Sequence, residues 1–440
     1  MSLQRRYSGI GRIAAGLSKQ VAVAAFVLSL LGVPWGTFAA GLPTASPEQV
    51  GLSKQRLDRI GAFLNEDIGK GKLPGAVVLI ARHGKIAYWE AFGKRDPASP
   101  AAMGKDDIFR IASMTKPLVT VGVIMLAEEG KFALREPISK YIPQLTKFQV
   151  AVEKPDPTTG KPTVVMAPQE REITIQDLLR HTSGFAYGFN APPRVRAQYE
   201  EADKEISADM YSNAELMDRL TKLPLAYQPG TEWQYGHSFE VLGRLIEVVS
   251  GKTLGAFLEE RILKPLGMTD TAFYVPESKW GRVAEGGINP QTHMPVTRPA
   301  PKVPPKLESG GGGLLGTAGD YLRFCQMMLN GGELEGVRLL GPRTVAWMTS
   351  DQLGAIPHHV EIMNGPGYTW AIGFAVRETG GLSNYPGSPG EYTWLGIYGT
   401  SFHVDPKEDM IVISMVQVPL STGLYYRAIV KTMAVDAILH

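Results

Sequence analysis

The sequence predicts an α/β fold of the α+β type, in which an antiparallel β-sheet is flanked by helices and interrupted by an inserted, mostly helical domain. Two observations carry this prediction: β-rich runs lie near both ends of the chain, and helical patterns fill its middle. With 440 residues, 44% of them hydrophobic, the chain can bury a large core and is neither a disordered chain nor a disulfide-stapled miniprotein. We expect a discontinuous sheet domain at 45–112 and 300–440, and a mainly helical domain with long loops at 113–299.

The first 39 residues have the pattern of a secretory signal peptide. Basic residues precede an apolar run at 21–33, and Thr37-Phe38-Ala39 places small residues at the cleavage positions. The run is shorter than the roughly 20 residues of a membrane span. We expect a mature protein that begins near Ala40, is periplasmic or secreted, and has no stable membrane span after cleavage. An uncleaved anchor is the alternative, and Arg5-Arg6 leaves the export route open.

Charge, cysteine content and histidine spacing argue against nucleic-acid binding, a disulfide and a metal site. The first 39 residues hold four basic residues and no acid, so the formal charge of +2 becomes −2 for the rest of the chain. That balance gives no electrostatic reason for binding nucleic acid. One cysteine excludes an intramolecular disulfide. The eight histidines show no metal-binding spacing, so we expect no metal and no cofactor.

The N-terminal elements follow from periodicity and turn residues. Residues 52–70 alternate apolar and polar positions with helical spacing, and 75–93 holds two β-rich runs around the turn at 82–85, which predicts a hairpin. Residues 118–126 are apolar almost all round. This predicts a buried helix, and Gly130 ends it.

The middle and the C-terminal part complete the pattern. Further helices are predicted at 175–180, 214–220, 239–250, 318–330 and 424–439. C-terminal strands are predicted at 373–376, 401–404 and 410–418. The segment 276–305 is rich in Pro and Gly and is expected to be a long irregular connection. We expect the N-terminal hairpin and the C-terminal strands to share one antiparallel sheet.

One tetrad has the spacing of a nucleophilic serine and its base. Ser113-Met114-Thr115-Lys116 is an S-x-x-K, and Pro117 is best tolerated in the first turn of a helix, so Ser113 and Lys116 should lie one turn apart on one face. A serine hydroxyl is a poor nucleophile until a base takes its proton, and a lysine can be that base when burial disfavours its charged form. On this segment alone, an N-cap serine beside a solvated lysine is an equally good interpretation.

Other segments stand in the same order as the motifs of one enzyme family. They are 178–184 (LLRHTSG), 229–235 (PGTEWQY), 241–243 (VLG), 264–268 (KPLGM), 310–314 (GGGGL) and 394–396 (WLG). Together with the S-x-x-K tetrad they resemble the serine hydrolases that include class C β-lactamases, D-Ala-D-Ala carboxypeptidases and family VIII carboxylesterases. The resemblance spans roughly 48–418 and implies a β-lactamase/penicillin-binding-protein-like fold.

The resemblance implies roles for single residues. Ser113 matches the acylated nucleophile, and Lys116 matches the lysine that shares its proton. Tyr235 matches the tyrosine of the family's second motif, which acts with Lys116 as general base and then protonates the leaving group. The third motif stands at 394–396, and the backbone N–H of Ile397 would pair with that of Ser113 as an oxyanion hole.

Two departures from the family pattern favour esters. The second motif reads Tyr-Gly-His at 235–237, so the asparagine that would bind a lactam or peptide amide is absent. In the third motif, which ends at Gly396, Trp394 stands where lactamases and peptidases carry lysine. Ester hydrolysis needs only the nucleophile, the base and the oxyanion hole. The tryptophan resembles family VIII esterases, and we take Trp394 and His237 as candidates for lining the substrate pocket.

The expected protein is therefore an exported serine hydrolase that cleaves small carboxylic esters with short acyl chains through an acyl-enzyme. The alternatives are a β-lactamase or D-Ala-D-Ala carboxypeptidase, and a non-catalytic binding protein of the same fold. Tyr211 lies in a literal Y-x-N but lacks the preceding Pro-Gly-Thr, so we interpret it as a decoy. His181 is expected to be structural, and a surface role for His237 is as good as a pocket role. The natural ester and the oligomeric state stay open.

Overall fold

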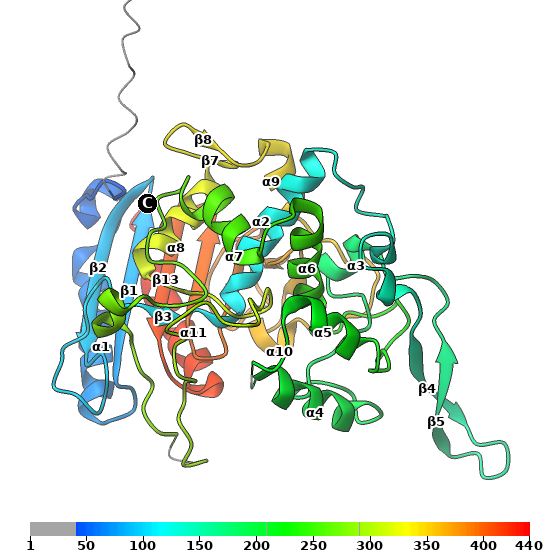
Figure 1. The fold of residues 1–440 in the computed structure, drawn as a ribbon. Helices are drawn as coiled ribbons and strands as arrows, with labels where there is room; N and C mark the ends of the chain where they lie inside the picture. The colour runs from blue at the N-terminus through cyan, green and yellow to red at the C-terminus, as the bar shows by residue number, and fades with distance from the viewer. Residues whose placement is uncertain (1–40, 208, 290) are drawn as a thin grey trace, which may run out of the picture. The chain divides into compact units, whose positions relative to one another are not determined.

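A seven-stranded antiparallel sheet organises the part of the chain that the structure, a computed structural model, describes: residues 41–440 except 208 and 290 (Figure 1). Its strand order is β2-β1-β13-β12-β11-β10-β9. The strands are β1 (Gly75–Arg82), β2 (Lys85–Gly93), β9 (Tyr368–Trp370), β10 (Ala375–Arg377), β11 (Tyr392–Leu395), β12 (Ser401–Asp405) and β13 (Met410–Val416). Because β1 pairs with β13, from Ala76 opposite Val416 to Arg82 opposite Met410, the prediction that both ends of the chain share one sheet is confirmed.

Alternate side chains of the inner strand β1 enter two different cores. Val78 and Ile80 pack with α1 (Lys54–Gly69) and α11 (Leu420–Asp436) on one face of the sheet. Val77 and Leu79 belong to the larger core on the opposite face. This burial on both faces explains why β1 reads as a continuous apolar run and not as an alternating one.

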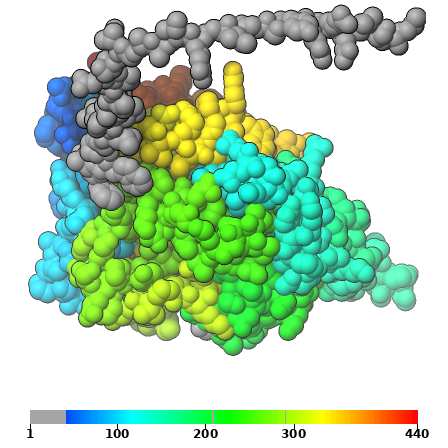
Figure 2. All heavy atoms as spheres, turned by 45° about the horizontal axis from the view of Figure 1, so that its top comes forward, coloured from blue at the N-terminus to red at the C-terminus, as the bar shows by residue number. Residues whose placement is uncertain are grey.

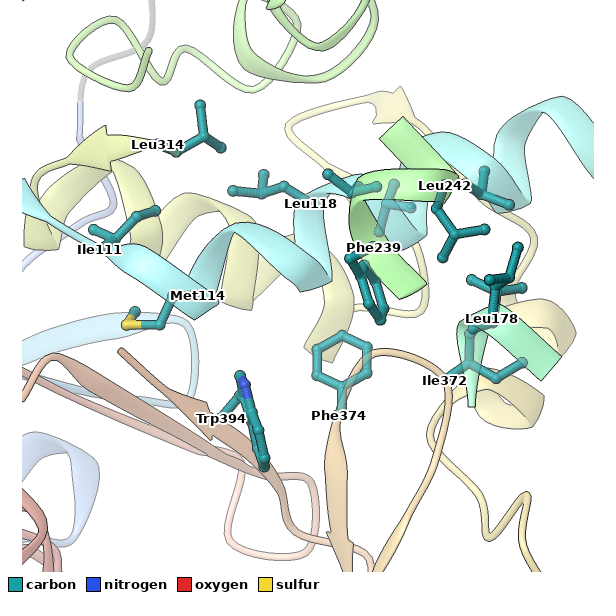
Figure 3. Close-up of a cluster of buried hydrophobic side chains, with 14 of the residues drawn as sticks. Ile111, Met114, Leu118, Leu178, Phe239, Leu242, Leu314, Ile372, Phe374 and Trp394 are labelled. Carbon is teal, nitrogen blue, oxygen red and sulfur yellow. The ribbon is translucent and has the colours of Figure 1, made fainter. Parts of the chain in front are cut away.

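Helices cover the second face and form the larger core. α8 (Ala318–Leu329) packs on β1 and β13, and α2 (Thr115–Glu128) packs against α6 (Ser238–Ser250) and α7 (Leu254–Leu258). Figure 3 shows Leu118 of α2, Phe239 of α6 and Trp394 of β11 turned toward this common interior. α2 is buried at every position from 115 to 126, as the apolar run at 118–126 predicts.

The remaining elements are short. The helices are α3 (Ile175–Leu179), α4 (Arg196–Ser207), α5 (Asn213–Leu220), α9 (Pro342–Met348) and α10 (Glu361–Asn364). The paired strands are β3 (Phe109–Arg110) with β6 (Leu315–Gly316), β4 (Gln149–Pro155) with β5 (Pro162–Pro168), and β7 (Glu333–Leu334) with β8 (Val337–Arg338). Short helical segments cover Pro47–Val50, Ala112–Met114, Ile138–Lys140, Pro143–Thr146, Glu259–Leu263 and Glu277–Arg282.

Several elements differ from the sequence prediction. The hairpin β4–β5, which projects from the other elements in Figures 1 and 2, and the helix α4 have no counterpart in it. α11 begins at Leu420, four residues before the predicted start at 424, because Pro419 in an extended conformation precedes its first turn. The segment 276–305 is irregular as expected, apart from the turn Glu277–Arg282.

The described residues form one compact unit, which contains both the sheet and the helical part. The boundaries at 113 and 300 stay a prediction. The predicted signal peptide lies outside the described residues. In the described part of the chain, no helix is long and apolar enough to span a bilayer.

Candidate active site

Ser113 stands at a sharp entry into α2. The chain leaves β3, makes the helical turn Ala112–Met114 and enters α2 at Thr115. Ala112 has a φ of 44°, in the left-handed region that costs free energy for a residue with a side chain, and such strain is often found at functional sites. Pro117 falls in the first turn of α2, where its missing N–H costs no helical hydrogen bond. Ser113 and Lys116 therefore face the same side, as predicted.

Lys116 is fully buried and reaches Ser113 directly. Its Nζ lies 3.1 Å from Ser113 Oγ, 2.6 Å from the carbonyl oxygen of Gly311 and 3.4 Å from the hydroxyl of Tyr187. Among the described residues, no carboxylate forms a salt bridge with it. The contact gives the serine hydroxyl a nearby nitrogen that can accept its proton.

Gly310 and Gly311 of the run at 310–313 let the backbone pass close to the N-terminus of α6. A Cβ on Gly310 would lie 2.3 Å from the Phe239 carbonyl oxygen, and one on Gly311 would lie 2.4 Å from the carboxylate of Glu240. At Gly310, where the neighbouring atom belongs to the backbone, only glycine permits such an approach. The Gly311 carbonyl can therefore accept its hydrogen bond from Lys116 beside the N-terminus of α6.

Tyr235 joins the pair through its ring and its hydroxyl. Lys116 Nζ lies 4.6 Å from the centre of the Tyr235 ring, and the indole Nε1–H of Trp394 donates a 3.3 Å hydrogen bond to the Tyr235 hydroxyl. Because an indole nitrogen only donates, the Tyr235 oxygen accepts this bond and keeps its own proton free to donate. Trp394 thus orients the tyrosine.

Two backbone N–H groups are available for a developing oxyanion. Within residues 41–440, leaving out 208 and 290, neither the N–H of Ser113 nor that of Ile397 donates a hydrogen bond, and both residues line one cavity. Gly396, before Ile397, lies so close to Ile111 that a Cβ would come within 2.6 Å of its carbonyl oxygen. The tight contact holds the 394–397 segment against Ile111, two residues before the serine, and the predicted oxyanion hole would form between these two segments.

The cavity that contains Ser113 has a volume of about 900 Å³, near the upper end of the range of small-molecule sites. Lys116 lies beneath it, and Tyr235, His237 and Trp394 line it. Apolar side chains form much of its wall, among them Phe189, Ile206, Phe273, Val303, Leu307 and Leu420. Three His, Cys, Asp or Glu side chains placed to hold a metal ion do not occur together anywhere in the described residues.

Two residues of the site were missed by sequence reasoning. The Tyr187 hydroxyl lies 3.4 Å from Lys116 Nζ and donates over 3.4 Å to Oε2 of Glu240, and burial, with the Glu240 charge second, raises the pKa of Tyr187 well above its usual value. Glu240, five residues after Tyr235, is buried in the first turn of α6 and also accepts a 2.9 Å bond from Ser309. Tyrosines that follow a turn and acidic residues at the start of a helix are common, so the sequence gave no reason to single out Tyr187 or Glu240.

The rival candidates have other surroundings. His181 is buried against the Tyr235 ring at 4.6 Å, and burial holds its pKa well below its usual value, so it stays neutral. Tyr211 donates its hydroxyl to Glu205 and does not line the cavity. The surface interpretation of His237 is wrong: its ring is 1% exposed, and Nε2 lies 2.9 Å from Oδ1 of Asp203. It turns inward because it precedes α6 in the same short segment as the buried Tyr235.

Comparison with known proteins places this geometry in a family. A family model described as Beta-lactamase matches residues 56–428. Esterase EstB of Burkholderia gladioli is 30% identical over 370 residues, which cover 79% of this chain and 86% of that protein, and Protein Rv1367c of Mycobacterium tuberculosis is 35% identical, with 82% and 90% covered. The solved structure of EstCE1, described as a hydrolase with promiscuous acyltransferase activity, has a TM-score of 0.70 and 25% identity and covers 88% of this chain and 99% of its own. The chain therefore belongs to the serine beta-lactamase-like family, beside its esterases.

Proposed function

We propose that this protein is an exported serine carboxylesterase that hydrolyses esters with short acyl chains through an acyl-enzyme on Ser113. The observation that carries the proposal is the 3.1 Å contact between Ser113 Oγ and the buried Nζ of Lys116, at a cavity lined by apolar side chains. Its relatives EstB and EstCE1, named as an esterase and a hydrolase, support the reaction class.

The proposed reaction uses four groups of the site. Ser113 Oγ attacks the ester carbonyl while its proton passes to Lys116, and the N–H groups of Ser113 and Ile397 stabilise the oxyanion. Tyr235 gives its hydroxyl proton to the departing alkoxide and regains a proton from Lys116, which leaves Ser113 acylated. A water molecule then attacks the acyl-enzyme by the same route, so one ester and one water give one acid and one alcohol.

Trp394 and His237 support a preference for esters over lactams. The indole Nε1–H of Trp394 is taken up by the Tyr235 hydroxyl, and the Nε2 of His237 by Asp203. Neither side chain offers a cation for a lactam carboxylate or an amide for a peptide bond. We assign the short acyl chain to the side closed by Trp394, and the wider apolar part of the cavity, toward Val303 and Leu307, to the alcohol.

The test compares substrates on purified protein. The kcat/KM for p-nitrophenyl butyrate should exceed that for a chromogenic cephalosporin by about a hundredfold or more, since each missing charge-assisted contact is worth roughly 1.5–3 kcal/mol. The butyrate ester should also be cleaved faster than the decanoate ester. Ser113→Ala should remove turnover and labelling by a fluorophosphonate. Equal or better hydrolysis of the cephalosporin would favour the lactamase or peptidase alternative, and a wild type without any turnover or labelling would favour a binding protein.

A further inference from the structure

We propose that Asp203 of α4 is a positioning residue of the esterase site, and that it acts by holding the hydroxyl of Tyr187 against Lys116. The inference rests on the proposed function. One carboxylate makes two bonds here: Oδ2 accepts a 2.7 Å hydrogen bond from the backbone N–H of Gly188, and Oδ1 accepts the Nε2–H of His237 at 2.9 Å.

Both bonds act on Tyr187. Gly188 is its neighbour in the chain, and the His237 ring meets the Tyr187 ring edge-on at 4.5 Å. On its other side, the His237 ring stacks on Tyr199 of α4 at 6.1 Å. The backbone after Tyr187 and the side chain beside it are therefore both tied to the same carboxylate.

The hydrogen bond to Asp203 is the polar contact that orients the His237 ring. Its Nδ1 is buried and has no hydrogen-bond partner among the described residues. A carboxylate only accepts, so the ring proton sits on Nε2. Removal of the carboxylate would leave two buried donors without acceptors, the Nε2–H of His237 and the N–H of Gly188. Buried donors without acceptors are unfavourable, so this region would rearrange.

A second residue locks the same loop to the catalytic tyrosine. Asn190 Oδ1 accepts the N–H of Tyr187 at 3.2 Å, and its Nδ2 donates to the carbonyl oxygen of Tyr235 at 3.0 Å. Gly236 allows this packing, because a Cβ there would lie 2.3 Å from the Phe185 carbonyl oxygen. The loop at 187–190 and the second motif are thus bonded to each other, and Asp203 bonds the loop to α4.

The group that Asp203 positions is the Tyr187 hydroxyl, which lies between Lys116 and Glu240. Tyr187 Oη lies 3.4 Å from Lys116 Nζ and 3.4 Å from Glu240 Oε2. A shift of about 1 Å in a group at the reacting centre can cost about a hundredfold in rate. Asp203 also lines the cavity, but among the described residues no hydrogen bond joins it to Ser113, Lys116 or Tyr235. Its loss should therefore lower kcat far more than it changes KM for a small ester.

The experiment measures kcat and KM for p-nitrophenyl butyrate, the rate at which a fluorophosphonate labels Ser113, and the thermal midpoint. Asp203→Leu should lower kcat and the labelling rate about ten- to a hundredfold. Asp203→Asn should restore most of both, because the amide oxygen can accept from Gly188 and the amide N–H can donate to a His237 ring that has changed tautomer. Glu201→Leu removes an exposed acid of the same helix, paired with Lys204, and should leave all values at wild type.

A double-mutant cycle separates positioning from general loss of structure. Tyr187→Phe should itself slow the enzyme, and Asp203→Leu added to it should cause little further loss, since the hydroxyl it positions is gone. If Asp203→Leu does not fold, His237→Phe replaces it in the cycle, because phenylalanine keeps the ring and loses the bond to Asp203.

The outcomes separate the two proposals. A folded Asp203→Leu with wild-type kcat and labelling, an Asn variant as slow as the Leu variant, or full additivity with Tyr187→Phe would overturn the positioning role. A wild type that labels but does not cleave esters would overturn the proposed function, and the labelling rates would then decide the role of Asp203. A wild type that does neither would overturn both.

Discussion

A single buried amine connects the reacting groups of this site. Lys116 Nζ touches the Ser113 hydroxyl, the Gly311 carbonyl and the Tyr187 hydroxyl. An arginine would keep the charge but cannot lose a proton near neutral pH. Lys116→Arg should therefore be as inactive toward p-nitrophenyl butyrate as Lys116→Ala. Substantial turnover by the arginine variant would show that the position works through its charge and not as a base.

The second catalytic prediction concerns Tyr235. Tyr235→Phe removes the proton donor for the leaving group and leaves the indole N–H of Trp394 without an acceptor, so kcat should fall at least about a hundredfold. Tyr211→Phe is the matched control, because it removes only a hydroxyl bonded to Glu205 away from the cavity, and it should be nearly silent. Steady-state kinetics of the two variants decide between them, and the reverse result would make Tyr211 the catalytic tyrosine.

Which contacts of the candidate site could be predicted depended on how far apart the residues lie in the sequence. Ser113 and Lys116 lie one helical turn apart, so their contact can be predicted from their spacing in the sequence. Tyr187, from a loop, reaches the same lysine through tertiary packing, and Glu240, at the start of α6, in turn accepts a hydrogen bond from Tyr187. Nothing local marks either residue, and so the sequence predicts only part of the site.

At the scale of an element, the first turn of α8 contains a carboxyl group, that of Asp320, whose pKa is raised. Burial raises the pKa of Asp320 to about 6, although it accepts bonds from Asp270 N–H and the Thr271 hydroxyl. The folded state then binds this proton more tightly than the unfolded chain, so the contribution of Asp320 to the free energy of unfolding is full below about pH 4 and falls as pH rises to about 6.

Asp320→Asn should remove that dependence. Relative to wild type, the variant should gain stability between pH 4.5 and pH 7. The gain is about 1.4 kcal/mol for each pH unit in which Asp320 is ionised in the unfolded chain but still protonated in the folded protein. Urea unfolding at the two pH values measures the change, with exposed Asp106→Asn as control. A difference between variant and wild type that is the same at both pH values would contradict the raised pKa.

Elements differed in how plainly the sequence predicted them. The hairpin β1–β2, the helix α2 and the helix α6 have strong periodicity or clear end signals, and all three form. α4 is largely polar and turns few apolar side chains, such as Tyr199 and Ala202, toward the core. Its burial comes from the loop packed against it, at Gly188, and that contact is invisible in a local pattern.

The sheet and its covering helix are joined by a buried ion cluster at the scale of the whole molecule. Glu391 lies 2.6 Å from Lys431 of α11 and 3.1 Å from the ring of His403 in β12, and all three are buried. Burial alone would raise the pKa of Glu391, but the charge of Lys431, the hydrogen bond from His403 and the charge of Arg377 outweigh it and hold the pKa well below its usual range.

Glu391→Gln should leave Lys431 buried without a counter-ion and lower the free energy of unfolding by about 3–5 kcal/mol at pH 7. Since a depressed carboxyl pKa stabilises above the pKa of the unfolded chain and the gain is lost in acid, the gap to wild type should narrow below about pH 4. Urea unfolding at pH 7 and at lower pH measures both. A Gln variant as stable as wild type at pH 7 would show that the cluster gives no net stability.

The pairing of β1 with β13 also sets the order in which the protein can fold. Ala76 lies opposite Val416, so an inner strand of the sheet that is made early in synthesis must pair with a strand made near its end. Such distant pairings slow folding, because the entropy of closing a long loop is lost before the contact forms. Until residues 410–416 leave the ribosome, β1 has only the hairpin partner β2, and its apolar side chains have no complete core on either face. The sheet of a nascent chain can therefore close only when synthesis is almost complete.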